Sequence, residues 1–384
     1  MRIGVPKEIV PGETRIAASP DSIKKFSALG VEVLVESGAG AGAQMSDEVL
    51  AEAGAHIVVD AKAVYREAEL VTKVRAPLCD GNAADELAQL RPDAVLVGLL
   101  APLQQREQVA RYAAHGVTTF AMELIPRISR AQSMDALSSQ SNIAGYKAVI
   151  DAADHFGRIL PMMMTAAGTV APARVVVLGA GVAGLQAIAT AKRLGALVSA
   201  FDVRPAVKEQ VESLGAKFIS VDADAGDDAE TAGGYAREMG DLYKTRQAAL
   251  IHETLTKQDI CITTAQIPGK PAPELITEAM VKDMKHGSVI VDLAVEGGGN
   301  CALSAYDQVV VRHGVTIIGH ANYPARVPVD TSTLYARNLF NFIQPMINQE
   351  NGSLNIDWED EVIRGALLTK GGAIVNPALE GGDI

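Results

Sequence analysis

Cysteine is scarce in this chain, and basic residues are outnumbered by acidic ones. The three cysteines among 384 residues, Cys79, Cys261 and Cys301, lie far apart and form no CxxC pair. This odd, dispersed set argues against a disulfide framework or a zinc ribbon and favours a reducing compartment. The 34 Lys and Arg against 46 Asp and Glu give a formal charge of −12, which disfavours nucleic-acid binding through a basic face.

Long hydrophobic runs are rare as well. The uncharged stretch Val175–Ala191 is shorter than the roughly 20 residues that a membrane-spanning helix needs. It contains three glycines at the fixed spacing of a known motif, so we interpret it as a buried strand, a tight turn and the start of a packed helix. The first residues, MRIGVPKEIVPGETR, lack the apolar core of a signal peptide, and we expect a soluble chain that is not secreted.

Short apolar, β-branched segments alternate with helical stretches in two series, over residues 1–125 and 170–320. This alternation is typical of α/β folds with parallel sheets. The predicted strands are Ile3–Pro6, Val31–Glu36, Leu70–Val74, Ala94–Gly98, Val175–Leu178, Leu197–Phe201, Lys217–Ile219, Ile260–Thr263, Val289–Val291 and Val315–Ile318. Two long helices, predicted over Ser133–Phe156 and Thr331–Asn348, lie at the domain junctions. We therefore predict one domain over 1–132, completed by 330–384, and a second over 133–329.

The strongest chemical signal is a glycine-rich turn between a predicted strand and a predicted helix. In RVVVLGAGVAG, Gly179, Gly181 and Gly184 match the G-x-G-x-x-G pattern of dinucleotide-binding folds. Gly179 allows the tight turn, Gly181 lets the backbone approach a pyrophosphate, and Gly184 lets the helix pack closely on the strand. Free N–H groups at the start of the helix would bind the anion.

Asp202 ends the next predicted strand, LVSAFD, and favours NAD over NADP. Its carboxylate can accept hydrogen bonds from the adenosine ribose hydroxyls, and it repels a 2′-phosphate. At about 4 Å and an effective dielectric constant near 20, each unit of like charge costs up to roughly 4 kcal/mol. Arg204 follows shortly afterwards and acts weakly in the opposite direction.

A second glycine run, Gly38–Ala43, matches G-x-G-x-x-A by spelling alone. Ser46, Asp47 and Glu48 are typical of a helix N-terminus further along the chain, with Ser46 as the cap. A delayed helix would direct its N–H groups away from the glycines. We therefore predict a flexible loop here and no second nucleotide site.

A dense polar segment, RISRAQSMDALS, leads into the first long helix. Two interpretations of it stay open. In one, Asp135 caps the helix and the arginines are solvated. In the other, Arg127, Gln132 and Asp135 reach a nicotinamide and hold its ring and carboxamide in register.

Residues Asp222 to Glu238 form a long, acidic, glycine-rich stretch without periodicity. A loop of this length inside an α/β domain is uncommon and is often functional. Tyr235, behind Gly233 and Gly234, is an aromatic residue on a flexible arm, suited to closing over a ligand. The alternative is a surface excursion without function.

Motifs for nucleophilic or metal-assisted catalysis are missing. The seven histidines are scattered, none pairs with another at metal-ligand spacing, and we expect no metal site. The sequence contains no G-x-S-x-G, Walker A or Cys–His signature. It thus offers a cofactor site without an evident acid–base catalyst.

Longer runs indicate a family. The chain resembles the α subunit of the proton-translocating NAD(P) transhydrogenases in the runs MRIGVPKEIVPGETRIAASP, ELIPRISRAQSMDALSSQSNIAGYKAVIDAA, PMMMTAAGTVAPARVVVLGAGVAGLQAIATAKRLGA, VESLGAKFI, TAGGYAREMG and VDLAVEGGGN. It looks most like the separate NAD(H)-binding component, domain I, of bacteria that divide the α subunit in two. The resemblance extends from Met1 to about Asn376.

This resemblance implies two Rossmann-like domains with parallel sheets, joined by two long helices with a cleft between them, and a homodimer. NADH would bind to the second domain at the cleft and pass hydride to NADP⁺ held by domain III of the β subunit. A membrane-spanning domain on another chain would move protons. The chain would be cytoplasmic, held at the inner face of the cell membrane by its partners, and active only within that complex.

The resemblance also assigns nucleotide contacts to residues of this sequence. The nicotinamide half would contact Arg127, Ile128, Ser129, Arg130, Gln132, Asp135 and Ser138. The pyrophosphate and adenosine half would contact Gly179, Gly181, Val182, Gly184, Asp202, Val203 and Arg204. Ala265 would line the same cleft, and Gly234 and Tyr235 would belong to a mobile loop over the nucleotide. Arg127, Gln132, Asp135 and Tyr235 are the residues predicted to act in hydride transfer.

Alanine dehydrogenase is the related family and the main alternative. That family uses an Arg and a Lys for the keto acid, with a His and an Asp near the reacting carbon. Here Arg15 is present, but Arg75 stands where the Lys is expected, Val95–Leu103 has no histidine, and Glu296 occupies the position resembling the Asp. Amine–carbonyl interconversion needs proton transfers, whereas hydride passage between two nicotinamides needs only aligned rings and excluded water. The missing histidine favours a transhydrogenase, and a non-catalytic NAD-responsive binding protein is the third possibility.

Overall fold

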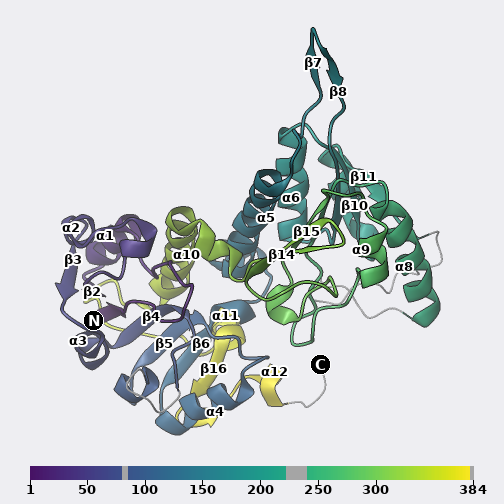
Figure 1. The fold of residues 1–384 in the computed structure, drawn as a ribbon. Helices are drawn as coiled ribbons and strands as arrows, with labels where there is room; N and C mark the ends of the chain where they lie inside the picture. The colour runs from purple at the N-terminus through teal and green to yellow at the C-terminus, as the bar shows by residue number, and fades with distance from the viewer. Residues whose placement is uncertain (80–84, 222–239, 381–384) are drawn as a thin grey trace. The chain divides into compact units, whose positions relative to one another are not determined.

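The computed structural model describes residues 1–79, 85–221 and 240–380 (Figure 1). Its contacts divide the chain into two compact units. Unit 1 comprises Met1–Gln140 and Ala325–Ile384, and unit 2 comprises Ser141–Pro324. Among the helices of the described ranges, none is both long enough and apolar enough to cross a membrane.

Unit 1 is built on an eight-stranded sheet in the order β17-β16-β6-β5-β4-β1-β2-β3. The strands are β1 (Arg2–Val5), β2 (Glu32–Glu36), β3 (Ala55–Val58), β4 (Leu70–Arg75), β5 (Val95–Leu99), β6 (Thr118–Ala121), β16 (Leu367–Lys370) and β17 (Ala373–Ile374). The first six run parallel, whereas β16 and β17 add an antiparallel edge supplied by the end of the chain. The helices are α1 (Pro20–Ala28), α2 (Asp47–Glu52), α3 (Ala61–Glu67), α4 (Arg106–His115), α10 (Pro328–Ile343), α11 (Glu361–Ala366) and α12 (Pro377–Glu380).

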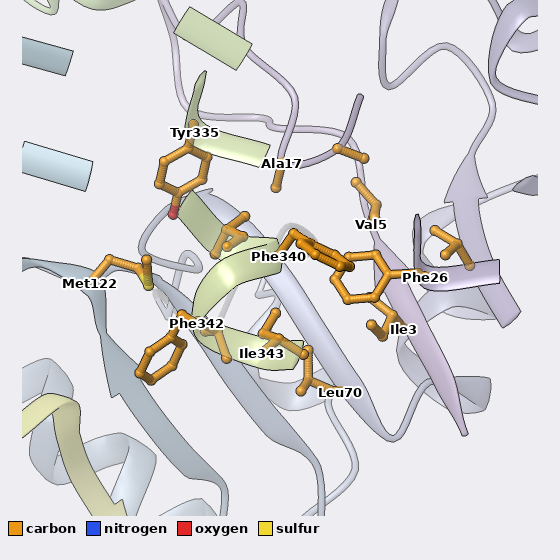
Figure 2. Packing of buried hydrophobic residues seen from close by; sticks show 14 of the residues in the cluster. Ile3, Val5, Ala17, Phe26, Leu70, Met122, Tyr335, Phe340, Phe342 and Ile343 are labelled. Carbon is orange, nitrogen blue, oxygen red and sulfur yellow. The ribbon is translucent and has the colours of Figure 1, made fainter. Parts of the chain in front are cut away.

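Helix α10 supplies much of the hydrophobic core of unit 1 (Figure 2). Phe340 packs edge-on against Phe26 of α1, with 5.0 Å between ring centroids. Phe342 packs in the same manner against Phe120 of β6 at 5.6 Å. Paired aromatic rings contribute about 0.5–1.5 kcal/mol each beyond their buried area. A helix near the end of the chain therefore completes the core of the first unit.

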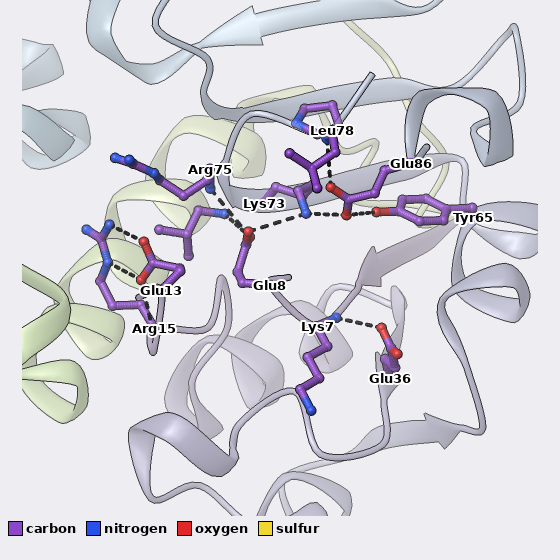
Figure 3. A network of polar contacts seen from close by, with 12 residues as sticks. Lys7, Glu8, Glu13, Arg15, Glu36, Tyr65, Lys73, Arg75, Leu78 and Glu86 are labelled. Carbon is purple, nitrogen blue, oxygen red and sulfur yellow. Dashed lines mark hydrogen bonds and ion pairs between the residues drawn. The ribbon is translucent and has the colours of Figure 1, made fainter. Parts of the chain in front are cut away.

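A buried polar network also lies in unit 1 (Figure 3). The Lys73 ammonium, fully shielded from solvent, is 2.6 Å from Glu86 Oε1 and 3.3 Å from Glu8 Oε2. Tyr65 Oη donates to the same Glu86 oxygen at 2.6 Å. Burial by itself would lower the pKa of Lys73, but the two carboxylates outweigh it and raise that pKa. Burial raises the pKa of Glu8, against the influence of Lys73.

Unit 2 is built on a seven-stranded sheet in the order β11-β10-β9-β12-β13-β15-β14. The strands are β9 (Arg174–Leu178), β10 (Leu197–Phe201), β11 (Lys217–Ile219), β12 (Ile260–Thr263), β13 (Val289–Asp292), β14 (Gln308–Arg312) and β15 (Val315–Gly319). All neighbours are parallel except the edge pair β14 and β15. The helices are α5 (Ala136–His155), which begins in unit 1, α6 (Val182–Arg193), α7 (Lys208–Ser213), α8 (Asp241–Leu255) and α9 (Glu278–Lys282). The two sheets confirm the predicted α/β class with Rossmann-like domains.

Close packing of α5 on α6 fixes the start of α6. A Cβ added to Gly145 of α5 would lie 2.0 Å from the carbonyl oxygen of Ala183, so only glycine fits at that position. Ala148 and Ala152 on α5 are fully buried in the same cluster. The small residues of the predicted first long helix thus pack against a neighbour, as expected.

A two-stranded hairpin, β7 (Met163–Thr165) and β8 (Gly168–Val170), stands off the body of unit 2 (Figure 1). Residues 162–171 are all exposed, including Met162 at 60% and Met164 at 77%. The stretch from Ile159 to Ala173 contains no Asp, Glu, Lys or Arg, so the hairpin carries no charged side chain. An isolated two-stranded hairpin is only marginally stable in water, and the apolar side chains of this one are exposed in the part of unit 2 that the structure describes.

Candidate functional site

The glycine turn of unit 2 lies where a Rossmann sheet binds its ligand. Strand order reverses between β9 and β12, and ligands bind outside the carboxyl ends of the strands at such a switch point. Gly179 directly follows β9, with a φ of +99° that L side chains rarely adopt. A Cβ on Gly184 would lie 1.9 Å from the carbonyl oxygen of Gly179. The structure thereby confirms that these glycines join a strand to a closely packed helix.

The first turn of α6 has the properties of an anion site. Gly181 is its N-cap residue, and within the described part of the chain no side chain caps this helix. The first N–H groups of a helix have no intrahelical partners and bear partial positive charge. A Cβ built on Gly181 would meet nothing within 4 Å, so space is open beside its backbone. The turn fits a pyrophosphate approaching Gly181 and the exposed Val182.

Asp202, at the end of β10, is tied to both the glycine turn and Arg204. Its Oδ2 accepts a hydrogen bond from the backbone N–H of Ala180 at 2.7 Å. The Arg204 guanidinium donates through Nε to Oδ1 at 2.9 Å and through Nη2 to Oδ2 at 2.8 Å. The carboxylate is buried, and Val203 beside it is partly exposed. Arg204 therefore opposes the Asp202 charge by direct contact.

The polar segment Arg127–Ser138 belongs to unit 1. Asp135 accepts hydrogen bonds from the backbone N–H of Ser138 at 2.8 Å and from its hydroxyl. This is an N-terminal cap for α5, so the part of the first interpretation that concerns Asp135 is confirmed. Arg127, Ser129 and Gln132 are not buried, and Ile128 is partly buried. Their predicted contacts with nicotinamide stay a prediction.

Arg130 differs from the solvated side chain of the first interpretation. Its Nη1 and Nη2 atoms donate to Asp360 Oδ2 and Oδ1, both at 2.9 Å, and Nε lies 3.4 Å from Glu361. The Arg130 hydrogen bond is the main reason why the pKa of Asp360 is lowered. This bidentate pair joins the polar segment to the start of α11.

The second glycine run does not open a helix. A single 3₁₀ turn over Ala41–Ala43 forms the end of the run, and α2 begins only at Asp47, with the Ser46 hydroxyl accepting from the Val49 amide. The predicted delay of the helix is confirmed. Asp47 instead accepts from the Gly38 amide at 2.9 Å and from the Ser37 hydroxyl at 2.7 Å, which closes the turn on itself.

Comparisons with known proteins match these two units over nearly the whole chain. Residues 4–144 match the family model "Alanine dehydrogenase/PNT, N-terminal domain", and residues 148–377 match the corresponding C-terminal domain. The first portion of a divided NAD(P) transhydrogenase subunit alpha from Rhodospirillum rubrum is 57% identical over 99% of both chains. The chain belongs to the family of NAD(P) transhydrogenase α subunits.

Solved structures agree with this family. A transhydrogenase from Sinorhizobium meliloti has a TM-score of 0.84 at 47% identity and covers 98% of this chain and 100% of its own. An L-alanine dehydrogenase has a TM-score of 0.81 at 28% identity, covering 99% and 98%. Alanine dehydrogenase from Bacillus subtilis is 32% identical over 88% of this chain and 83% of its own. Alanine dehydrogenases are thus more distant relatives than the transhydrogenase subunits, and this member is an NAD-binding oxidoreductase subunit with Rossmann-like domains.

The family resemblance also assigns Gly234, Tyr235 and Ala265 to the nucleotide site. Gly234, Tyr235 and the rest of the predicted loop Asp222–Glu238 lie outside the described residues. Ala265 follows β12, partly buried, at the carboxyl edge that also carries Gly179. Position 265 therefore shares an edge of the sheet with the glycine turn.

Two features of the site were missed by the sequence reasoning. Tyr243, in the first turn of α8, has its pKa raised by burial first and by the negative charge of Asp202 second. Asn300, fully buried, hydrogen-bonds the backbone of Ala265, and the equally buried Asp292 accepts a hydrogen bond from the backbone N–H of Asn300. The available signal was the aspartate ending the apolar run VIVD, because a polar side chain there points to the carboxyl edge of the sheet.

Proposed function

We propose that this chain is the NAD(H)-binding subunit of a proton-translocating transhydrogenase. It passes hydride between NADH on unit 2 and NADP⁺ on domain III of a partner β subunit, and a membrane-spanning domain on another chain couples the transfer to proton movement. The observation that carries the proposal is the 57% identity, over 99% of both chains, with the Rhodospirillum rubrum transhydrogenase α-subunit component. The chain acts on the cytoplasmic side of the cell membrane, attached through its partners.

The adenosine half of NADH binds at the glycine turn in this proposal. The α6 N-terminus receives the pyrophosphate, because Gly181 has open space beside it and the helix has no side-chain cap within the described residues. Asp202 receives the ribose hydroxyls after exchanging part of its contact with Arg204. Val203 and Ala265 flank the nucleotide, and Gly234 with Tyr235 closes over it.

The nicotinamide half is held by the polar segment of unit 1. Arg127 and Gln132 have side chains suited to the carboxamide, and Asp135 orients them from its place at the α5 cap. Ile128, Ser129, Arg130 and Ser138 complete the contacts. Hydride transfer between two nicotinamides moves no proton at the reacting carbons, so the work of these residues is to align one ring and exclude water.

We further propose that two copies associate through the β7–β8 hairpin. Copies that each carry a formal charge of −12 repel one another, and the hairpin is an uncharged place at which they can meet. Met162, Met163 and Met164 are exposed by 60%, 46% and 77%. A flexible, apolar methionine surface adapts readily to a second copy of itself. We therefore propose that the hairpin binds a second copy of this chain and forms a homodimer.

A second function, NAD-dependent amino-acid dehydrogenation, is favoured by the likeness to L-alanine dehydrogenase at a TM-score of 0.81. It would require a positioned acid–base group. No histidine occurs in Val95–Leu103, the segment that contains β5. This difference from the dehydrogenase pattern favours transhydrogenation.

The deciding experiment measures NADH oxidation by the purified chain in two mixtures. One contains pyruvate and ammonia, and the other contains domain III of a β subunit with NADP⁺. We expect turnover only in the second. Turnover in the first alone would replace the proposal with a dehydrogenase, and NADH binding without turnover in either would indicate a non-catalytic NAD-responsive protein.

A further inference from the structure

A single buried carboxylate organises the loop that follows β13. Asp292 is 0% exposed, and its Oδ1 accepts hydrogen bonds from the Thr263 hydroxyl at 3.1 Å and the Ala294 amide at 3.0 Å. Its Oδ2 accepts from the backbone N–H of Asn300 at 2.9 Å, the backbone N–H of Cys301 at 3.0 Å and the Ser304 hydroxyl at 2.7 Å. Donors from β12 and from the loop after β13 converge on this group, so it fixes the backbone on which Asn300 sits.

The side chain of Asn300 binds both backbone groups of Ala265. Its Oδ1 accepts from the Ala265 N–H at 3.0 Å, and its Nδ2 donates to the Ala265 carbonyl oxygen at 2.9 Å. The same Nδ2 donates to the carbonyl oxygen of Pro273 at 2.8 Å. Asn300 is itself 0% exposed. The side-chain amide of Asn300 thus makes with Ala265, which lies beyond the end of β12, the two backbone hydrogen bonds that a neighbouring strand would otherwise make.

Thr264 carries this constraint to the glycine turn. Its hydroxyl donates to the carbonyl oxygen of Gly179 at 3.0 Å, and its amide donates to the Leu178 carbonyl oxygen at 2.8 Å. A Cβ on Gly179 would lie 2.6 Å from the Thr264 hydroxyl oxygen, so the two segments are in close contact. A continuous series of hydrogen bonds therefore runs from Asp292 through Asn300 and the residues after β12 to the turn before α6.

We propose that Asn300, seated by Asp292, is a positioning residue for the nucleotide site. It touches no nucleotide; it sets the backbone at Ala265 and, through Thr264, the carbonyl of Gly179. The inference rests on the proposed function, since it assigns Asn300 a role at the site where NADH is proposed to bind. A loosened Ala265 loop would misplace one wall of the site and the turn that presents Gly181.

Asn300→Asp tests the inference, because it keeps the shape and an acceptor but removes both N–H donors. Asn376→Asp is the matched control in unit 1. Asn376 is 3% exposed, donates to the Gly365 and Leu367 carbonyl oxygens at 3.0 and 2.7 Å, and accepts from the Ala378 amide at 3.0 Å. NADH dissociation constants by calorimetry and urea midpoints are measured for both variants and for the unchanged protein.

We expect Asn300→Asp to weaken NADH binding about tenfold or more, and Asn376→Asp to change it less than twofold although both lower the urea midpoint. Thr264→Val serves where Asn300→Asp fails to fold, since it removes only the hydroxyl that contacts Gly179. It is expected to weaken NADH binding about threefold at an unchanged midpoint. Normal NADH affinity in Thr264→Val and in a folded Asn300→Asp would overturn this inference but leave the proposed function intact. Failure of the unchanged protein to bind NADH would instead overturn the proposed function.

Discussion

The Arg204 guanidinium lies against the Asp202 carboxylate, with Nε 2.9 Å from Oδ1 and Nη2 2.8 Å from Oδ2. A carboxylate after the second strand of a Rossmann domain, here β10, disfavours NADP because it repels the 2′-phosphate. A guanidinium on that carboxylate cancels part of the repulsion and can itself attract phosphate. We therefore expect the preference of this chain for NAD to be set by a pair of opposite charges and to be weaker than Asp202 alone would make it.

Arg204→Ala should sharpen the preference for NADH. The variant leaves the Asp202 charge uncompensated and removes the cation nearest the expected 2′-phosphate. We expect NADPH affinity to fall about tenfold or more and NADH affinity to change less than threefold, a difference of at least about 0.7 kcal/mol. Fluorescence titration with the two nucleotides measures both. A proportional loss for NADH would mean that Arg204 holds a part of the nucleotide common to both.

Gly181→Ala and Gly184→Ala should separate binding from folding. A Cβ on Gly181 meets nothing within 4 Å, so the first variant should keep its thermal midpoint while its NADH affinity falls about tenfold. A Cβ on Gly184 would lie 1.9 Å from the Gly179 carbonyl oxygen, and overpacking of this kind costs about 1–3 kcal/mol. Calorimetry and NADH titration test the pair. Unchanged NADH affinity in Gly181→Ala would show that the pyrophosphate does not approach this turn.

Asp135→Asn isolates the proposed nicotinamide role from the cap. Asn caps helices as well as Asp does, so α5 should be retained. We expect hydride transfer to domain III to fall about tenfold while NADH affinity and the thermal midpoint stay nearly unchanged. The matched control is Asp60→Asn, because Asp60 caps α3 by accepting the Ala63 amide at 2.9 Å. Equal losses of rate and affinity in Asp135→Asn would indicate that the segment only binds.

Lys73→Met should be strongly destabilising. It leaves the Glu8 and Glu86 carboxylates buried without the ammonium that lies 3.3 and 2.6 Å from them. Removal of one member of a buried ion pair costs about 3–5 kcal/mol. The control Lys257→Met breaks an exposed pair with Glu253, and its urea midpoint should match that of the unchanged protein. A Lys73→Met variant as stable as the unchanged protein would show that both carboxyl groups take up protons at no cost.

Met164→Lys should weaken the proposed dimer without harming the monomer. Met164 is 77% exposed, so the substitution buries nothing in the single copy but places an unpaired charge in an interface at the hairpin. We expect the dimer dissociation constant, by sedimentation velocity, to rise at least about tenfold. Leu242→Lys is the control, since Leu242 is 68% exposed on α8, away from the hairpin segment in sequence. If both variants remain equally dimeric, the hairpin is not the interface.

The parallel strands and the glycine turn were readable from sequence because they depend on local patterns. Strands such as Val175–Leu178 lie in the sheet interior and are continuous apolar runs, which a single window reveals. Every predicted strand overlaps an observed one. The glycines of the turn are needed for reasons that lie within a few residues of chain, such as the φ of +99° at Gly179, which L side chains rarely adopt.

The missed elements are short or lie at sheet edges. Strands β3, β6, β7, β8, β14, β16 and β17 were not predicted, because strands of two to five residues are too short to show a clear hydrophobic pattern in sequence. The predicted helix Thr331–Asn348 extends too far: α10 ends at Ile343 and a 3₁₀ turn over Gln344–Met346 follows. Pro345 lacks the N–H that a continued helix would require.

The polar contacts of the site were beyond sequence reasoning for a different reason. The pairs Arg130–Asp360 and Asn300–Ala265 join residues far apart in the chain, so no local spacing relates them. They form because folding brings strand ends and loops to the same edge. The assigned nucleotide contacts and the domain bounds 1–132 with 330–384 and 133–329 stay predictions.

The contact of Phe26 with Phe340, whose ring centroids lie 5.0 Å apart, also affects the order in which the two units fold during synthesis. Ribosomes add about 5–20 residues per second, so Phe340 follows Phe26 by about 15 to 60 s. During that interval all of Ser141–Pro324 is synthesised, and the hydrophobic core of unit 1 lacks the side chains that α10 contributes. The second unit to be encoded is thus the first that can finish folding, and the nascent first unit keeps part of its apolar core exposed for longer.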